Sequence, residues 1–203
     1  GTTAAVNVSE NSTAVTTVTS TDVDAGATAT YSIIGGADAA KFTIDAATGA
    51  LSFVSAPDFE KKKKKNEDNV YDVTVQVSDS LGGADTQAIA VTVTNVNEAP
   101  IITSNGSGTT AAVNAAENST VVTTVTSTDV DAGATATYSI VGGTDAAKFT
   151  IDASTGALSF ASAPDYESPT DAGADNVYDV TVQVSDGSLT DTQDIAVTVT
   201  NVN

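Results

Sequence analysis

The sequence contains an internal repeat, which restricts the chain to folds that a single copy can form. Residues 1–79 align with residues 108–186 at a constant offset of 107 without a gap, and both copies end in VTVTNVN. A copy of roughly 100 residues is large enough for its own hydrophobic core. We therefore predict two tandem domains, at 1–97 and 98–203. Copy one has no counterpart of IITSNGS (101–107), so we expect its first strand to be incomplete.

The clearest difference between the copies is a block of lysines. The 79 aligned positions hold 15 differences, and seven of these form the consecutive block 61–67, where KKKKKNE stands opposite SPTDAGA at 168–174. Because copy two does without the lysines, the fold does not require them. We interpret Lys61–Lys65 in three ways: a solvated loop before the next strand, a contact for acidic polysaccharide or another anionic surface, or a local electrostatic modulator of a nearby cation site.

Each copy has the pattern of an all-β domain. In copy one, VYDVTVQV (70–77) and AIAVTVTNV (88–96) alternate apolar and polar residues with a period of two, as half-buried strands do. Connectors of Gly, Asp, Ala and Thr, such as DAATG (45–49), separate the apolar runs. Seven short strands at this spacing predict a Greek-key β-sandwich in each copy, with the other strands expected at 3–8, 14–20, 28–34, 41–44 and 50–54.

The ten aromatic residues recur at matched positions in the two copies. Aromatic side chains bury large areas and chiefly anchor hydrophobic cores. We therefore expect them to pack in the core and not to form an exposed platform for a ligand. The pairs are Tyr31/Tyr138, Phe42/Phe149, Phe53/Phe160, Phe59/Tyr166 and Tyr71/Tyr178.

Composition excludes several classes of function. The formal net charge is −19 at pH 7, which argues against nucleic acid and anionic membranes as partners and favours cations. Cys, His and Trp are absent, so disulfides, thiolate chemistry, a histidine base and a soft-metal site are excluded. No apolar run reaches the length of a membrane span, so we expect no membrane insertion by these residues. Methionine is absent even at position 1, and we expect a piece of a longer chain.

Acidic residues recur at matched places near the predicted strand ends. In copy one the motifs are SEN (9–11), TDVDAG (21–26), PDFE (57–60) and VSD (77–79), and TNVNEAP (94–100) joins the copies. Taken in order, this set resembles the cadherin repeat, with its Glu-Asn element, Asp-x-Asp-x-Gly loop, Leu-Asp-Arg/Tyr-Glu motif, Ala-x-Asp-x-Gly motif and Asp-x-Asn-Asp-Asn-x-Pro linker. The resemblance covers nearly the whole chain and is greatest to cadherin-like repeats of large secreted or surface proteins of bacteria. It implies a cadherin/immunoglobulin-like sandwich in each domain.

In cadherins, calcium ions sit where successive domains join, so the resemblance implies calcium ligands in this sequence. The chemistry agrees, because Ca²⁺ prefers hard oxygen ligands from carboxylates, amides and carbonyls. The implied junction ligands are Glu10, Asp58 and Glu60 of the first domain, Asn95, Asn97 and Glu98 of the linker, and Asp129, Asp131 and Asp186 of the second domain. The implied outer half-sites, toward further repeats, contain Asp22, Asp24, Asp79, Glu117, Asp165 and Glu167.

The sequence departs from the family pattern in two places. Asn95 stands where the family usually has aspartate, and the linker is one residue shorter than in animal cadherins. The loop after Asp131 is also shorter and lacks the usual asparagine. With fewer anionic ligands available, we expect fewer ions or weaker binding than at animal cadherin junctions.

The expected function is a calcium-rigidified extracellular adhesion or spacer module, secreted or on a bacterial cell surface. Its expected partners are calcium, neighbouring repeats, and either a second copy of itself or a polysaccharide. Asp58 and Glu60 are two neighbouring carboxylic acids, such as a glycosidase uses for catalysis. The pair recurs in both copies without any other catalytic group, so we expect no enzyme activity. The alternative function is a carbohydrate-binding module of a secreted bacterial polysaccharide-degrading or biofilm protein, although sugar platforms favour exposed aromatic faces.

Overall fold

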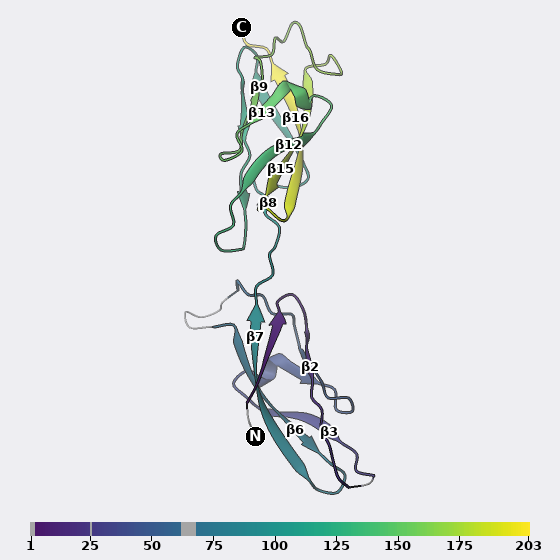
Figure 1. The fold of residues 1–203 in the computed structure, drawn as a ribbon. Coiled ribbons are helices and arrows are strands. Elements are labelled where there is room, and N and C mark those ends of the chain that lie inside the picture. The colour runs from purple at the N-terminus through teal and green to yellow at the C-terminus, as the bar shows by residue number, and fades with distance from the viewer. Residues whose placement is uncertain (1–2, 25, 62–67) are drawn as a thin grey trace. The chain divides into compact units, whose positions relative to one another are not determined.

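The chain folds into two units, Gly1–Val96 (unit 1) and Asn97–Asn203 (unit 2), which we describe one at a time. The computed structural model describes residues 3–24, 26–61 and 68–203, and Figure 1 traces their fold. Lys61 is among the described residues, whereas Lys62–Lys65 lie outside them.

Unit 1 is a sandwich of two sheets, and the chain passes repeatedly from one sheet to the other. The larger sheet has the order β1-β7-β6-β3 and the smaller one the order β2-β5-β4. Strand β1 runs parallel to β7, and the other neighbouring strands are antiparallel. The elements are β1 Ala4–Ser9, β2 Ala14–Thr17, β3 Thr30–Gly35, the single-turn 3₁₀ helix η1 Ala39–Lys41, β4 Phe42–Ile44, β5 Ala50–Phe53, β6 Val70–Ser78 and β7 Ala84–Thr94.

Unit 2 repeats this sandwich and adds one short pair of strands. Its sheets have the orders β12-β15-β16-β9 and β10-β14-β13, and the additional pair is β11-β8. The elements are β8 Ile101–Ile102, β9 Thr110–Ala116, β10 Val121–Thr124, β11 Ser127–Thr128, β12 Thr137–Gly142, η2 Ala146–Lys148, β13 Phe149–Ile151, β14 Ala157–Phe160, β15 Val177–Ser185 and β16 Thr190–Thr200. The predicted all-β fold of two tandem sandwiches is confirmed.

The period-two pattern of the long strands places one face of each strand in the core. In unit 1, Val73 and Val75 of β6 and Val91 of β7 are each at most 1% exposed, and they pack with Leu51 and Phe53 of the opposite sheet. Each such side chain contributes about 1.5–3 kcal/mol when fully buried. The hydrophobic effect therefore holds the two sheets together, as the alternation predicts.

Most of the aromatic pairs form part of these cores. Phe42 and Phe53 stack with ring centroids 4.6 Å apart, and Tyr71 meets the edge of Phe53 at 5.2 Å. The same arrangement recurs in unit 2 with Phe149, Phe160 and Tyr178. The expectation of core packing is wrong for Tyr166, which is 39% exposed because it lies in a turn outside every strand.

Candidate metal centre

The first cluster of acidic residues in unit 1 is built around Glu10, which directly follows β1. This side chain is 2% exposed, and its two carboxylate oxygens accept different backbone hydrogen bonds. Oε2 accepts the N–H of Phe59 at 2.6 Å, and Oε1 accepts the N–H of Val96 at 2.8 Å. Glu10 therefore joins the end of β1 to two segments far away in sequence and places the PDFE motif beside itself.

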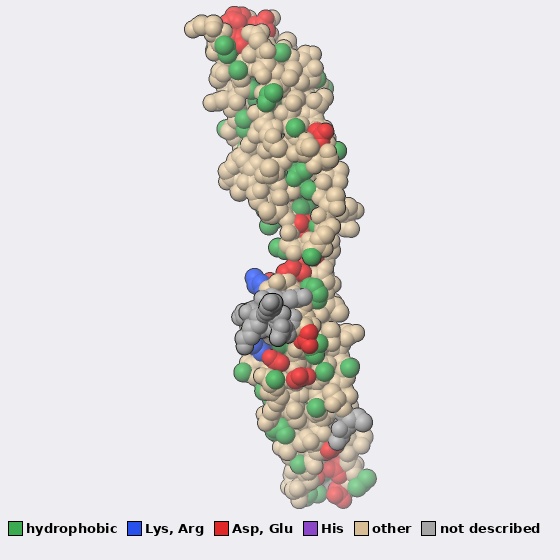
Figure 2. All heavy atoms as spheres, turned by 90° about the vertical axis from the view of Figure 1, so that its left-hand side faces the viewer, with side chains coloured by type: hydrophobic (Ala, Val, Ile, Leu, Met, Phe, Trp, Pro, Cys, Tyr) green, Lys and Arg blue, Asp and Glu red, His purple; other side chains and the backbone are tan. Residues whose placement is uncertain are grey.

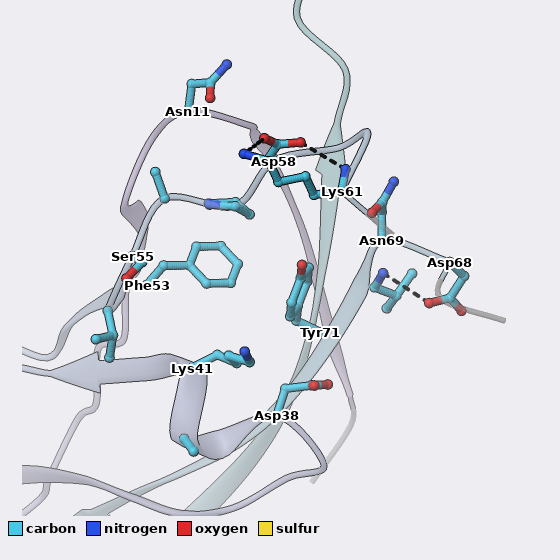
Figure 3. Close-up of a pocket in the computed structure, with 15 residues that line it drawn as sticks. Asn11, Asp38, Lys41, Phe53, Ser55, Asp58, Lys61, Asp68, Asn69 and Tyr71 are labelled. Atoms are coloured by element: carbon cyan, nitrogen blue, oxygen red, sulfur yellow. Dashed lines mark hydrogen bonds and ion pairs between the residues drawn. The ribbon is translucent and has the colours of Figure 1, made fainter. Parts of the chain in front are cut away.

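Asp58 and Glu60 complete this cluster. Glu10, Asp58 and Glu60 each offer one carboxylate oxygen, and these three oxygens lie within 4.8 Å of one another. Lys61 approaches from the next position along the chain, with its Nζ 2.9 Å from Asp58 Oδ2 (Figure 3). The hydrogen bond from the Lys61 side chain holds the pKa of Asp58 below its ordinary value. The cluster thus gathers negative charge, and one lysine partly neutralises it.

Unit 2 repeats the cluster with Glu117, Asp165 and Glu167, whose oxygens also lie within 4.8 Å of one another. Glu117 is 5% exposed and accepts the N–H groups of Val202 at 2.8 Å and Tyr166 at 3.1 Å. Both hydrogen bonds lower the pKa of Glu117, the one from Val202 more than the one from Tyr166. Figure 2 shows acidic side chains gathered at the end of unit 2 that carries the C-terminus, on an otherwise mostly neutral face.

A different acidic set lies near the start of unit 2. Asp131 Oδ2 accepts the N–H of Glu98 at 2.7 Å, and Asp129 Oδ1 accepts the N–H of Asp131 at 2.9 Å. Asp186 Oδ2 accepts the side-chain N–H of Asn97 at 2.7 Å. Backbone hydrogen bonding from Leu189, together with the Asn97 contact, lowers the pKa of Asp186. The Asn97 side chain also donates to the carbonyl of Glu98 at 3.2 Å, so hydrogen bonds join these residues, predicted as ligands from three separate motifs, into one group within unit 2.

One atom of this set is notable for its surroundings. Asp129 Oδ2 is buried, and within the described part of the chain it has no hydrogen-bond partner. A buried carboxylate oxygen left without a donor costs free energy, so it is suited to accept a cation. The donor set of carboxylate and amide oxygens is also the type that Ca²⁺ prefers. The residues present therefore fit a calcium ion.

The equivalent set in unit 1 has the same local hydrogen bonds. Asp22 Oδ1 accepts the N–H of Asp24 at 2.8 Å. Asp79 Oδ1 accepts the N–H groups of Gly83 and Leu81, each at 2.8 Å, and these bonds lower the pKa of Asp79. The predicted outer half-sites thus have the same local geometry as their counterparts in the other unit.

The nine predicted junction residues divide between the two units. Glu10, Asp58, Glu60 and Asn95 belong to unit 1, where Asn95 is exposed just after β7. The other five, Asn97, Glu98, Asp129, Asp131 and Asp186, belong to unit 2. The sequence analysis missed the backbone N–H groups of Val96 and Val202, since no sequence signal marks a main-chain donor. It also missed the ion pair that Lys61 forms with Asp58.

The sandwich and the repeated acidic clusters can now be compared with known proteins. The family model described as the cadherin domain matches residues 4–96 and 110–200, well over half of the chain. The chain belongs to the cadherin domain family. Tandem cadherin domains are extracellular modules of the adhesion type and are not enzymes.

Individual relatives agree with this family. The Drosophila melanogaster protein "Protocadherin-like wing polarity protein stan" is 32% identical over 203 residues, which cover 94% of this chain and 5% of that protein. The structure of human protocadherin-24 EC1-2 has a TM-score of 0.62 at 20% identity, covering 98% of this chain and 95% of that one. Mouse cadherin-23 EC22-24 has a TM-score of 0.57 at 25% identity, covering 98% of this chain and 63% of that one.

This cadherin chain therefore spans only a small part of the length of its curated relative. Among its described residues, no helix combines the length and the apolar character needed to cross a membrane.

Proposed function

We propose that this cadherin chain binds Ca²⁺ through its acidic clusters and acts as a calcium-rigidified adhesion or spacer module. The observation that carries the proposal is the repeated cluster, Glu10–Asp58–Glu60 in unit 1 and Glu117–Asp165–Glu167 in unit 2. In each cluster, a buried glutamate is held by two backbone N–H groups. The glutamate of each cluster is therefore positioned before an ion arrives, so its binding requires little further ordering.

The set near the start of unit 2 would contribute additional oxygen ligands. Asp129, Asp131, Asp186, Asn97 and Glu98 follow the cadherin motifs, and Asp129 Oδ2 is a buried acceptor to which none of the described residues donates. A Ca²⁺ ion takes six to eight oxygen ligands, more than one three-carboxylate cluster supplies. In the proposed module, carboxylates from both units would share ions, and each ion would restrict the motion of one unit against the other.

The proposal is tested by titrating calcium into the full chain by calorimetry and by following the melting temperature and small-angle scattering with and without a chelator. An ion that binds only the folded state stabilises it by about 2.7 kcal/mol when its concentration is 100 times Kd. We expect binding heat, a higher melting temperature and a narrower distribution of interdomain distances. No binding heat together with unchanged melting and scattering would refute the proposal.

Charge-matched variants assign the ligands. Asp58→Asn and Asp165→Asn remove one carboxylate from each repeated cluster, and we expect each to weaken calcium binding. Asp72→Asn in β6 removes the same charge away from both clusters and is the control. Equal affinity of Asp58→Asn and Asp72→Asn would remove Asp58 from the ligand set.

Self-association and contact with neighbouring repeats remain part of the proposal, because adhesion modules act through such contacts. The carbohydrate-binding alternative has no support from the structure, since the aromatic rings that a sugar platform needs are mostly in the cores. The relatives named above come from animals, and the bacterial origin stays a prediction.

A further inference from the structure

Four segments of the chain have the sequence Asn-x-Ser/Thr, which is the acceptor pattern for attachment of a sugar to asparagine in extracellular proteins. The pattern requires two groups, the Asn amide and the hydroxyl two positions later. The four segments are NVS (7–9), NST (11–13), NGS (105–107) and NST (118–120). The fold uses these two groups differently in each segment, so the structure distinguishes between them.

In unit 2, the segment that begins at Asn118 leaves both groups open to solvent. It lies in the turn between β9 and β10, and Asn118 and Thr120 are exposed. The Asn118 N–H donates to the carbonyl of Pro164 at 2.9 Å, and the Thr120 carbonyl accepts the N–H of Phe160 at 2.8 Å. Within the described part of the chain, no hydrogen bond involves the Asn118 side-chain amide or the Thr120 hydroxyl. The backbone is therefore held while the two acceptor groups are free.

The conformation of the turn explains part of this sequence. Asn118 has a φ of 59°, in the left-handed region that asparagine adopts more readily than most other residues. The turn alone is therefore a sufficient reason for an asparagine at this position. It gives no reason for the hydroxyl of Thr120, which makes no hydrogen bond within the described residues.

The Asn-Gly-Ser segment after β8 uses the same groups inside the fold. Asn105 Nδ2 donates to Oε1 of Gln193 at 3.3 Å, and Asn105 Oδ1 accepts the hydroxyl of Thr123 at 3.0 Å. The Ser107 hydroxyl donates to the carbonyl of Thr103 at 3.2 Å. A transferase could reach the Asn105 amide only after these bonds open, so this segment is protected in the folded chain.

Unit 1 contains one exposed turn and one strand of this pattern. Asn11 has a φ of 61°, and its N–H donates to the carbonyl of Pro57 at 2.9 Å, which is the geometry of Asn118. Asn7, by contrast, lies within β1, which pairs with β7 along its whole length. The next residue, Val8, is 8% exposed and belongs to the core. The segment at Asn7 cannot leave the sheet to enter a transferase without exposing Val8.

We propose that Asn118 is a site of N-linked glycosylation in the folded chain, with Asn11 as its counterpart in unit 1. The sugar donor is a glycosyl diphosphate, carried by a lipid or by a nucleotide. Asn118 Nδ2 forms a bond to C1 of the sugar as the bond between C1 and the diphosphate oxygen breaks. The diphosphate leaves with the electron pair of that bond, and the amide loses one proton to a base of the transferase. No oxidant or reductant takes part.

The position gives the sugar a structural consequence. Asn118 directly follows Glu117 of the acidic cluster, and Asn11 directly follows Glu10. A glycan is bulky and hydrated, so it limits which surfaces can approach this end of each unit. The new bond is made at an amide and leaves the carboxylates unchanged. The inference therefore goes beyond calcium binding and does not rest on it.

The test follows modification of the full chain in two arms, one for each donor. In the first arm, the folded chain is incubated with a soluble asparagine glycosyltransferase and a nucleotide-linked hexose. In the second arm, the chain is secreted from cultured animal cells, where the donor is lipid-linked. Mass spectrometry of proteolytic peptides locates the sugars, and we expect them on Asn118 and Asn11. In the first arm, Asn105 should react at least about tenfold more slowly, because its segment must first open. Modification in one arm alone identifies the donor.

Variants at the hydroxyl keep the turn intact. Thr120→Ala retains Asn118 and should abolish its modification while leaving that of Asn11 unchanged, and Thr120→Ser should retain it. Thr124→Ala removes the same side chain within β10, outside the acceptor segment, and is the matched control. Unfolded peptides of residues 101–109 and 116–122 should both be modified, because the fold and not the sequence protects Asn105.

Three results would overturn the proposal. The first is an unmodified Asn118 in both arms when the peptide of residues 116–122 is modified, since the fold would then hide the amide. The second is full modification of Asn118 in Thr120→Ala. The third is modification of Asn105 in the folded chain as fast as that of Asn118. The melting temperature of Thr120→Ala, expected to equal that of Thr124→Ala, separates loss of the acceptor from loss of the fold.

Discussion

Tyr71 of unit 1 and Tyr178 of unit 2 lie in the same local sequence, DNVYDVTVQVSD, and differ in exposure. In unit 2, Ala172 N–H donates to Asp145 Oδ1 at 2.8 Å, and Thr170 N–H donates to the hydroxyl of Tyr178 at 3.1 Å. Tyr178 is 1% exposed. In unit 1, the corresponding Tyr71 is half-buried and lines a pocket of about 650 Å³ with Phe53, Asp38 and Lys41 (Figure 3).

The comparison separates the features that the two units share from the segment in which they differ. Both units share seven strands and the aromatic stacks, because the hydrophobic alternation that forms them is the same, and unit 2 adds β8 and β11. The acidic clusters recur because the motifs that carry them recur. The segments 61–67 and 168–174 differ in every position, and residues 168–174 make no strand. The larger sheet, to which each tyrosine belongs, has the same strand order in both units.

The largest expected effect comes from removing the side chain that distinguishes the cores. Ile102→Ala should lower the free energy of unfolding of unit 2 by about 2–5 kcal/mol, because it leaves a cavity where β8 packs. Hydrogen exchange measured separately in the two units checks this. Ile101→Ala, at a site that is 59% exposed, is the control and should change stability by no more than about 0.5 kcal/mol. Equal losses for the two variants would show that β8 does not anchor the core.

A smaller effect is expected from the aspartates that precede η1 and η2. Asp145 accepts the N–H groups of Ala172 and Asp179, whereas Asp38 accepts that of Asp72 from the residues that the structure describes, which exclude Lys65, the counterpart of Ala172. Asp145→Asn should therefore cost unit 2 about 2 kcal/mol, and Asp38→Asn should cost unit 1 about 1 kcal/mol. Chemical denaturation of the two variants measures both costs. If Asp38→Asn lowers stability as much as Asp145→Asn does, the hydrogen bond from Ala172 to Asp145 contributes nothing to the stability of unit 2.

The lysine next to the acidic cluster should have a still smaller effect, and this prediction rests on the proposed calcium binding. Lys61→Ser gives unit 1 the residue that unit 2 has at Ser168, and Ser168→Lys makes the reverse exchange. Exposed ion pairs contribute at most about 1 kcal/mol, so we expect calcium affinity to change by no more than about fivefold. It should rise for Lys61→Ser and fall for Ser168→Lys, with both changes decreasing at high salt. Calorimetry with both variants decides, and a change of the opposite sign would contradict the prediction.

The smallest difference between the two units is expected in how acid changes their stability. Hydrogen bonds from the Ser154 side chain and the Thr155 backbone lower the pKa of Asp152 from 3.8 to about 2, and Thr48 lowers that of Asp45 in the same turn of unit 1. A lowered folded-state pKa adds stability above pH 3.8, and that stability is lost as the pH falls through the folded-state pKa near 2. Unfolding measured between these pH values should show Asp152→Asn flattening the pH dependence of unit 2. If Asp152→Asn leaves the dependence of the unfolding free energy on pH unchanged, the protonation of Asp152 does not affect the stability of unit 2.

Much of the acidic architecture was predictable from the ordered set of motifs. Glu10, Asp58 and Glu60 come from two motifs on different segments, and the resemblance to cadherins placed them in one set before any geometry was available. The sequence analysis missed the way in which this set is held. The N–H groups of Phe59 and Val96 that bind Glu10 belong to the backbone, which every residue carries. No residue type marks such a donor, so only the path of the chain reveals it.

The sequence by itself determined the two tandem sandwiches and their strands, because alternation of apolar and polar residues is a local property that the repeat states twice. The tertiary structure alone decided which residues in identical local sequence are buried and which are exposed. Gln87 and Gln193 both end the tripeptide DTQ, yet one is exposed and the other is 0% exposed. The cause is the segment that follows β8 in unit 2: Ser104 and Asn105, which lie 89 and 88 residues before Gln193, form hydrogen bonds with its side chain. Burial depends on such distant neighbours, and a local sequence does not contain them.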